Sequence, residues 1–297
     1  MIIRIIKTTL YFLFTICSTL CILCLPSLFT YNRKVSFQPF LYVFQIEDTI
    51  KLLLHVDEIT FTTSGTGTLK EYPLFPTIWE PYIYSLSLLI GTFVIALIMA
   101  TGLSYLYMLS SLRGQKWMKN ILFVFEAIPD MMIIVCLQAL LIWYFKQTGS
   151  MPVRVLSFGE KKAFVLPILC LCILPTIQMF RMLIVYLKDE QKKPYMEVVR
   201  GKGFTLRYIT AVHLFRNVFI HLFYHSKTIF LFMLSNLFIL EYIFNMNGIM
   251  KFLVDYGSRN TAISVVVVSL LFLPFFMFFL LGSLAVKRVG SQEEVNV

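Results

Sequence analysis

Two carboxylates flank a proline in an apolar stretch of the sequence, one helical turn apart. Glu126 and Asp130 lie on either side of Pro129. Ionisable side chains are costly in such surroundings and are therefore functional candidates by default. The pair could bind an amine or a metal ion on a substrate, or it could form a structural ion pair with a basic residue such as Arg181. The structural pairing is the favoured interpretation.

The other residue types that carry chemistry form no recognisable catalytic or metal-binding pattern. His213, His221 and His225 are too dispersed for a metal site, and no GxxxxGK[ST] loop is present to hold phosphates. The cysteines all fall inside apolar runs without metal-site spacing, as expected of small buried hydrophobes; they are Cys17, Cys21, Cys24, Cys136, Cys170 and Cys172. We therefore expect no metal site in these residues, and any ATPase would be a separate chain.

The composition requires a membrane. Of the 297 residues, 58% are hydrophobic and only 14% are charged, and the mean hydropathy is +0.79. Soluble domains carry about a quarter charged residues, so a cytosolic enzyme is disfavoured. The net charge is +10. The basic residues that carry it stand in short groups between the apolar runs, where they meet lipid headgroups. We expect membrane lipid, and no nucleic acid, as a partner.

Six runs have the roughly 20 apolar residues that a membrane helix needs. They cover residues 5–29, 82–108, 118–145, 162–186, 222–246 and 261–286. The first is too long for a typical signal-peptide core and lacks a clear cleavage site, so we interpret it as an uncleaved span. The fold class predicted is an all-α integral membrane protein with about six transmembrane helices. The Lys and Arg residues between the spans place both termini in the cytoplasm.

These spans define the expected organisation. Residues 1–29 form the first transmembrane helix, 30–81 an extracytoplasmic segment, 82–288 a five-helix core with a cytoplasmic loop at 187–220, and 289–297 a tail. Within 30–81, Phe40, Val43, Phe44, Ile50 and Leu54 have helical spacing, typical of a helix that lies in the membrane interface or packs on other helices. The stretch TTSGTGT is expected to be a loose loop. Nothing in this segment resembles a catalytic or ligand-binding domain.

The loop between the fourth and fifth spans differs from the others. It reads KDEQKKPYMEVVRGKGFTLRYITAVHLFRNVF. Pro194 suits the first turn of a helix, Tyr195–Lys202 favours a short helix, and Gly203 is placed to end it. A second amphipathic helix is expected to follow, with Leu206, Ile209, Val212 and Phe215 on one face. Such a helix–turn–helix is suited to docking in a groove of a partner, although a plain basic cytoplasmic loop explains the pattern equally well.

The same stretch resembles a signature of ABC-importer permeases, E-A-A, three residues, then Gly. Glu197, Val198 and Val199 take the E-A-A places before Gly203, while the I-x-L-P ending of the signature is absent. The dipeptide, oligopeptide and nickel importers instead read Y-V-R-T-A-R-A-K-G followed by H-x-L-R-N, and this chain matches that pattern at Tyr195, Arg200, Lys202, Gly203, His213, Arg216 and Asn217. Their later V-E-T-[VI]-F-S-W-P-G-L-G motif is echoed at Glu241, Phe244, Gly248 and Ile249.

The resemblance is good over about 160–288, fair over 75–145 and weak before that. It implies the type I ABC-importer permease fold in a bacterial cytoplasmic membrane, with peptides as the substrate class, in a transport subunit that is not an enzyme and binds no cofactor itself. It also implies three kinds of partner: a second permease of the same or a different sequence, two ATPase subunits that bind ATP and Mg²⁺, and an extracytoplasmic solute-binding protein. The docking loop would comprise Tyr195, Glu197, Arg200, Lys202, Gly203, His213, Arg216 and Asn217. Candidate pathway or gating residues are Glu126, Asp130, Glu241 and Gly248, with Glu241 favoured for structure or gating.

The fifth span departs from the family pattern. Bulky or polar residues replace common glycines at Lys227, Leu231, Leu234 and Ser235, and His221 replaces a frequent proline. Two alternatives therefore stay open. The chain could be a sensor or scaffold that keeps the docking loop without transporting, or a secondary transporter that uses Glu126 and Asp130.

Overall fold

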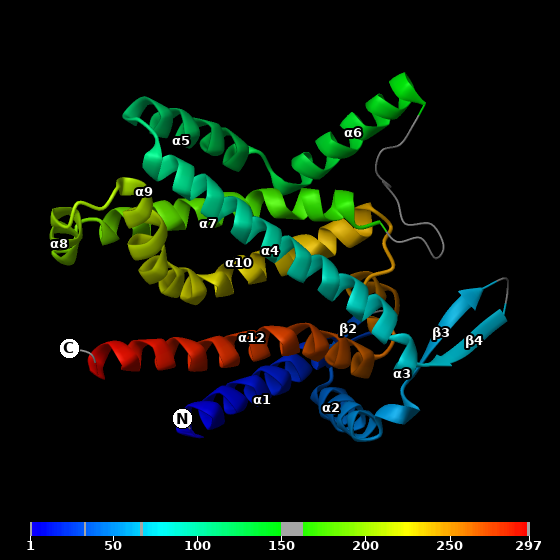
Figure 1. The fold of residues 1–297 in the computed structure, drawn as a ribbon. Helices are drawn as coiled ribbons and strands as arrows, with labels where there is room; N and C mark the ends of the chain where they lie inside the picture. The colour runs from blue at the N-terminus through cyan, green and yellow to red at the C-terminus, as the bar shows by residue number, and fades with distance from the viewer. Residues whose placement is uncertain (1, 33, 66–67, 150–162, 296–297) are drawn as a thin grey trace. The chain divides into compact units, whose positions relative to one another are not determined.

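The structure is a computed structural model that describes residues 2–32, 34–65, 68–149 and 163–295. Within these residues, six helices are long and apolar enough to cross a membrane (Figure 1). The corresponding segments are Thr9–Leu28, Trp79–Leu109, Asp130–Thr148, Val165–Glu190, Leu206–Ile243 and Thr261–Gly282. The predicted helical membrane architecture is confirmed.

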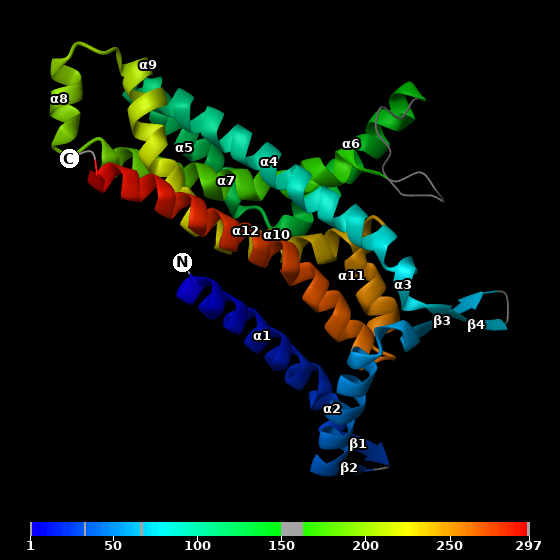
Figure 2. The ribbon, with the colours of Figure 1, turned by 60° about the horizontal axis from the view of Figure 1, so that its bottom comes forward.

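The chain forms two compact units. Unit 1 comprises Met1–Tyr84 and Asn247–Val297, and unit 2 comprises Ser85–Met246. In unit 1, α1 (Ile2–Cys24) and α12 (Thr261–Val295) run side by side (Figures 1 and 2). A short 3₁₀ helix, η1 (Leu25–Leu28), follows α1. It leads into two antiparallel strands, β1 (Phe29–Asn32) and β2 (Lys34–Phe37).

Helix α2 (Pro39–Leu54) packs one face on α1 and α12 of unit 1. Tyr42, Ile46 and Leu53 pack against a buried cluster of Leu20, Cys24 and Val265. The face predicted from the sequence points away from this cluster, because Phe40, Val43, Phe44, Ile50 and Leu54 are all exposed. One face of this helix therefore packs on other helices, as one of the two alternatives predicted, and the position of its exposed apolar face in the membrane interface stays a prediction.

Most of the stretch expected to be a loose loop is β-strand instead. After η2 (Val56–Glu58), β3 (Thr60–Gly65) pairs antiparallel with β4 (Thr68–Pro73). Residues 62–65 of the stretch belong to β3 and Thr68 begins β4, while residues 66–67 lie outside the described residues. Phe61 lies opposite Tyr72 in this register, and its side chain is buried. The turn-rich composition concealed two features that favour a strand. The β-branched threonines favour extended structure, and one aromatic residue supplies a buried anchor. Short α3 (Leu74–Thr77) then leads into α4 (Trp79–Leu109).

The third predicted span, 118–145, is wrong as a single helix. Unit 2 instead has α5 (Leu112–Ala127) and α6 (Asp130–Thr148), which meet at an angle in Figure 1. Ile128 has φ −83° and ψ 126°, an extended conformation that the following proline favours. Pro129 also lacks the N–H that a continuous helix would use. The membrane-crossing helix is therefore α6, and α5 is a separate amphipathic helix.

The expected second helix of the cytoplasmic loop is the start of the fifth span. Helix α8 (Tyr195–Gly201) follows α7 (Val165–Glu190), and helical structure then continues from α9 (Leu206–Tyr208) through the π-helical segment η3 (Ile209–Leu214) into α10 (Phe215–Ile243). No proline or glycine interrupts 206–243. The π-helical segment shifts the side-chain register, so Ile209 and Phe215 of the predicted face are buried whereas Leu206 and Val212 are exposed.

Candidate functional site

The loop between α7 and α10 in unit 2 has a short helix and a glycine turn. Helix α8 ends at Gly201, Lys202 is its C-cap, and the Gly203 N–H donates to the Arg200 carbonyl at 3.0 Å. Gly203 has φ +79°, a left-handed conformation that glycine adopts without steric cost. The Thr205 hydroxyl then accepts from the Tyr208 N–H and caps the next helix. Gly203 therefore ends α8 as predicted and sets the direction of the chain into the fifth span.

A buried carboxylate joins the two ends of this loop. Glu190 is the last residue of α7 and is only 2% exposed. Its Oε1 accepts from the Tyr195 hydroxyl at 2.7 Å and from the Asn217 side-chain amide at 2.8 Å, while Oε2 pairs with Lys193 at 2.7 Å. A buried carboxylate needs such partners, because an unpaired charge there would be strongly destabilising. Glu190 thus connects α7, α8 and α10 at the base of the loop.

The remainder of the loop is exposed. Every residue from Arg200 to Tyr208 is exposed, and α8 is anchored through Met196, which is buried. Figure 2 shows α8 standing beyond the end of α7, linked to α9 by an extended segment. The surface of this loop combines basic side chains with large apolar ones: Val198 is 62% exposed and Phe204 is 42% exposed. Exposed apolar groups of this kind mark interaction surfaces.

The predicted docking residues therefore divide into two groups. Glu197, Arg200, Lys202 and Arg216 are exposed. The others serve the shape of the loop: Tyr195 and Asn217 bind Glu190, Gly203 makes the turn, and His213 packs near the rings of Phe204 and Tyr208. Glu190 was not among the predicted site residues, because nothing in the charged stretch KDEQKK distinguishes it from its neighbours. Two adjacent carboxylates, Asp189 and Glu190, stand there, and only the packing of α7 decides which of them is buried.

A second candidate site is a cavity of about 1130 Å³ in unit 2, bordered by α5, α7 and α10. The expected ion pair between Glu126 and Arg181 is present at its wall. The ring of Tyr186 stacks on His221 at 5.1 Å and also contacts His225, which lines the cavity. Asp130 lies elsewhere, at the first position of α6, where a carboxylate stabilises the helix N-terminus. The structure therefore separates the roles of the two carboxylates.

Glu241 and Gly248 occupy two different units. Glu241, in the last turn of α10, is fully buried and accepts a hydrogen bond from the Ser85 hydroxyl of α4 within unit 2. This contact joins α10 to α4, and the role of Glu241 in structure or gating stays a prediction. Gly248 belongs to unit 1, where it precedes α11 (Ile249–Phe252) in an extended conformation. Ser85 gave no signal in the sequence, because a single serine in an apolar helix is common.

Together, the six membrane helices among the described residues define a multi-pass membrane protein, and the loop anchored on Glu190 lies between its fourth and fifth spans. A family model described as "Binding-protein-dependent transport system inner membrane component" matches residues 92–290. This match covers more than half of the chain, including the whole loop at 187–220. The chain belongs to this family.

A solved structure supports the fold assignment. The chain resembles one in the structure titled "Inward facing conformations of the MetNI methionine ABC transporter: CY5 native crystal form", with a TM-score of 0.51 and 17% sequence identity. The match covers 71% of this chain and 94% of that chain. No curated protein sequence matches the chain. The protein is thus a multi-pass inner-membrane permease subunit of an ABC importer, in a family whose ATPases are separate subunits.

Proposed function

We propose that this permease docks its ATPase through α8 and the turn at Gly203, and that the transported substrates are peptides. The observation that carries the docking proposal is the carboxylate of Glu190, which fixes both Tyr195 and Asn217. Between these anchored ends the loop exposes both apolar and basic side chains, among them Val198, Lys202 and Phe204. A surface held in this way can transmit rigid-body motion of a bound ATPase to α7 and α10.

The peptide proposal rests on the chain's own residues. The motif from Tyr195 to Asn217 resembles that of the dipeptide, oligopeptide and nickel importers. The cavity in unit 2 also presents both a carboxylate and a guanidinium, in Glu126 and Arg181. Such a pair can exchange its mutual contact for the two ends of a zwitterionic substrate. The methionine transporter shares 17% identity with this chain, which supports the fold and not the choice of substrate.

The proposed assembly has a second permease subunit, two ATPase subunits that bind ATP and Mg²⁺, and an extracytoplasmic solute-binding protein. Lys and Arg residues are more numerous on the side of the membrane that holds the two termini, which supports cytoplasmic termini. In this orientation the loop at 187–220 faces the ATPases. The hairpin β3–β4, which lies between the first and second spans, faces the opposite side of the membrane.

The docking proposal is tested by co-purification and uptake. The ATPase encoded with this chain is co-expressed with the full-length permease, and complex formation is compared for Arg200→Glu, Lys202→Glu and the control Lys192→Glu. Lys192 is also exposed but pairs with Asp189 outside α8. The α8 variants are expected to lose ATPase binding and ATP-driven peptide uptake while the control retains both. Unchanged binding by both α8 variants would contradict the proposal.

A non-transporting sensor is the second candidate. It is favoured by α10, where Lys227, Leu231 and Ser235 occupy common glycine positions and all three side chains are exposed on the helix. Reconstituted complex distinguishes the two functions: ATP-dependent accumulation of a labelled peptide in vesicles excludes the sensor, and ATPase docking without accumulation supports it. Loss of uptake with an inactive ATPase would exclude a secondary transporter.

A further inference from the structure

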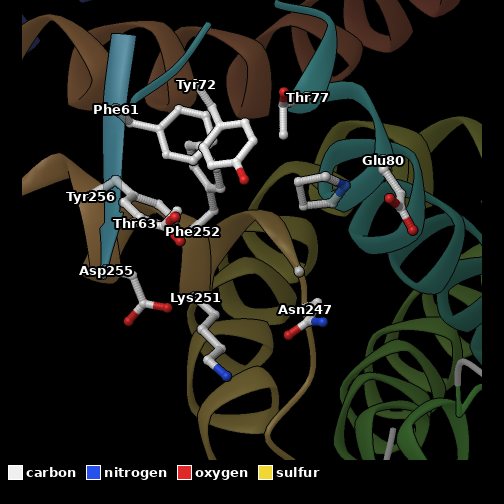
Figure 3. A pocket seen from close by; sticks show the side chains of 12 residues that line it. Phe61, Thr63, Tyr72, Thr77, Glu80, Asn247, Lys251, Phe252, Asp255 and Tyr256 are labelled. Carbon is white, nitrogen blue, oxygen red and sulfur yellow. The ribbon is translucent and has the colours of Figure 1, made fainter. Parts of the chain in front are cut away.

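Unit 1 contains a cavity of about 430 Å³ between the hairpin β3–β4, the start of α4, and the segment from Asn247 to Tyr256 (Figure 3). Its volume lies near the lower end of the range of about 300–1,000 Å³ found for small-molecule sites. The hairpin that forms one wall lies outside the family match at 92–290. The cavity therefore combines a wall outside the family match with the segment that follows the fifth span.

One side of the cavity is aromatic. The ring of Phe61 lies 4.6 Å from that of Tyr256 and 5.2 Å from that of Phe252, and the ring of Tyr72 stacks on Phe61 at 6.0 Å. Figure 3 shows the rings of Phe61 and Tyr72 beside one another above Phe252. Aromatic surfaces of this kind bind apolar or aromatic side chains of a ligand with preferred geometry.

The other side carries charges of both signs. Lys251 and Asp255 project from successive turns of the segment α11–η4 (η4, Leu253–Gly257), and Glu80 borders the cavity from the start of α4 (Figure 3). A cation and two carboxylates around one small cavity match a ligand with both a carboxylate and an ammonium group. The aromatic wall leaves room beside them for a side chain.

A closely packed π-helical turn carries Asp255 and Tyr256 at the cavity wall. The segment η4 is π-helical, a conformation that is frequent at functional sites. The Ser264 hydroxyl donates to the Gly257 carbonyl at 2.9 Å, and a Cβ at Gly257 would lie 2.4 Å from that hydroxyl oxygen. Only glycine fits there without a shift. This packing fixes the turn that carries Asp255 and Tyr256 to the cavity wall.

We propose that this cavity binds a zwitterionic solute of amino-acid to dipeptide size with an aromatic or large apolar side chain. Lys251 binds the carboxylate, Asp255 and Glu80 bind the ammonium group, and Phe61, Tyr72 and Tyr256 hold the side chain. The site would receive solute on the side of the membrane opposite the ATPases. The inference rests on the proposed function for its place in transport, whereas the binding itself can be measured separately.

The test uses the full-length chain in lipid nanodiscs and isothermal titration with L-phenylalanine and L-phenylalanyl-L-alanine. At least one zwitterion is expected to bind with a dissociation constant below about 1 mM. Phenethylamine, phenylacetate and N-acetyl-L-phenylalaninamide each lack at least one of the charges. Each is expected to have an affinity lower by about tenfold or more. Failure of both zwitterions to bind, or equal binding of the uncharged amide, overturns the inference.

Variants locate the binding in this cavity. Lys251→Met and Asp255→Asn are each expected to weaken zwitterion binding by about tenfold or more. Thr63→Trp should abolish binding by filling the cavity without removing a charge. The matched controls Lys51→Met and Asp48→Asn alter exposed charges on α2 of the same unit and should leave affinity unchanged. Wild-type affinity in both charge variants and in Thr63→Trp overturns the inference.

The same preparations separate this inference from the proposed function. If the binding site exists but the chain does not transport peptides, titration succeeds and the assembled complex shows no uptake. If transport occurs without this site, uptake continues and the titration is flat. An effect of Lys251→Met on uptake without any zwitterion binding overturns the solute site and points to a contact with a partner protein.

Discussion

Tyr195 and Asn217 lie 22 residues apart in the sequence and bind the same carboxylate oxygen of Glu190, as well as each other at 3.2 Å. They are the first and last residues of the motif that resembles the peptide-importer signature. Their shared partner explains why a tyrosine and an asparagine are needed at these two places. The hydroxyl and the amide together satisfy one buried carboxylate and hold α8 against the ends of α7 and α10.

Removing the charge of Glu190 should weaken this arrangement. In Glu190→Gln, one carboxylate oxygen becomes an amide nitrogen. The side chain is then neutral, so the ion pair with Lys193 is lost. We expect the protein to lose about 1–3 kcal/mol of stability, in the range for a hydrogen-bonded buried charge, and ATP hydrolysis to become uncoupled from uptake. Asp189→Asn is the control, because Asp189 is exposed and pairs only at the surface with Lys192. Thermal unfolding in detergent measures the first effect; equal unfolding temperatures for the two variants would contradict it.

The hydroxyl of Tyr195 should contribute at neutral pH and be lost only at high pH. Burial, followed by the hydrogen bond to Glu190 and the charge of Glu190, raises the pKa of the Tyr195 phenol to about 12, from about 10 for an ordinary tyrosine. Because the folded-state pKa is raised, the stabilisation is complete below about pH 10 and disappears as the pH rises toward 12. The stability difference between wild type and Tyr195→Phe should thus stay constant from about pH 7 to 9. A difference that also stays constant from about pH 10 to 12 would show that the phenol has the same, ordinary pKa in the folded and unfolded states.

The turn at Gly203 should couple ATPase binding to transport. Gly203→Asp places a side chain at φ +79°, which costs about 1–2 kcal/mol for most residues and less for aspartate, and it adds a negative charge to a basic docking surface. We expect the variant to reach the membrane at normal levels and to lose uptake. Gly201→Ala is the matched control, since Gly201 is helical and a Cβ there meets open space. Normal uptake by Gly203→Asp would contradict the assigned role of the turn.

The sequence predicted what depends on composition and local pattern. The apolar runs located the membrane helices because each must satisfy its own backbone hydrogen bonds in lipid. Gly203 was predicted to end α8 because glycine alone adopts a left-handed conformation without cost. The pairing of Glu126 with Arg181 was predicted because an ionisable group inside a membrane bundle needs a partner.

Interactions between distant residues were not predictable in the same way. Nothing local to Glu190 shows that Asn217 lies beside it, because that contact depends on how α7 packs along α10. The cavity in unit 1 depends on Phe61 meeting Phe252, which lies in a different segment of the chain. The break between α5 and α6 was available locally from Pro129, but uniform hydropathy across 118–145 concealed it.

The turn η4 should depend on the absence of a side chain at position 257. Gly257→Ala would place its Cβ 2.4 Å from the Ser264 hydroxyl oxygen and 2.9 Å from Cδ1 of Leu253. We expect a loss of about 1–3 kcal/mol, as for overpacking in a buried site. Ser264→Ala removes both the clash and the hydrogen bond, so the double variant should be more stable than the sum of the two single losses. Additive losses in thermal unfolding would show that Ser264 is not the constraint.

The ion pair at the cavity of unit 2 should matter more for transport than for folding. Glu126 and Arg181 join α5 to α7, and 62% of the Arg181 side chain and 37% of the Glu126 side chain are exposed. An exposed ion pair contributes about 0–1 kcal/mol to stability. Arg181→Gln, Glu126→Gln and the double variant are therefore each expected to keep the yield of folded protein, as measured by monodisperse protein after purification. Uptake should fall in all three because the pair contacts peptide substrate in the proposed function. Full uptake by the double variant would remove the pair from the transport pathway.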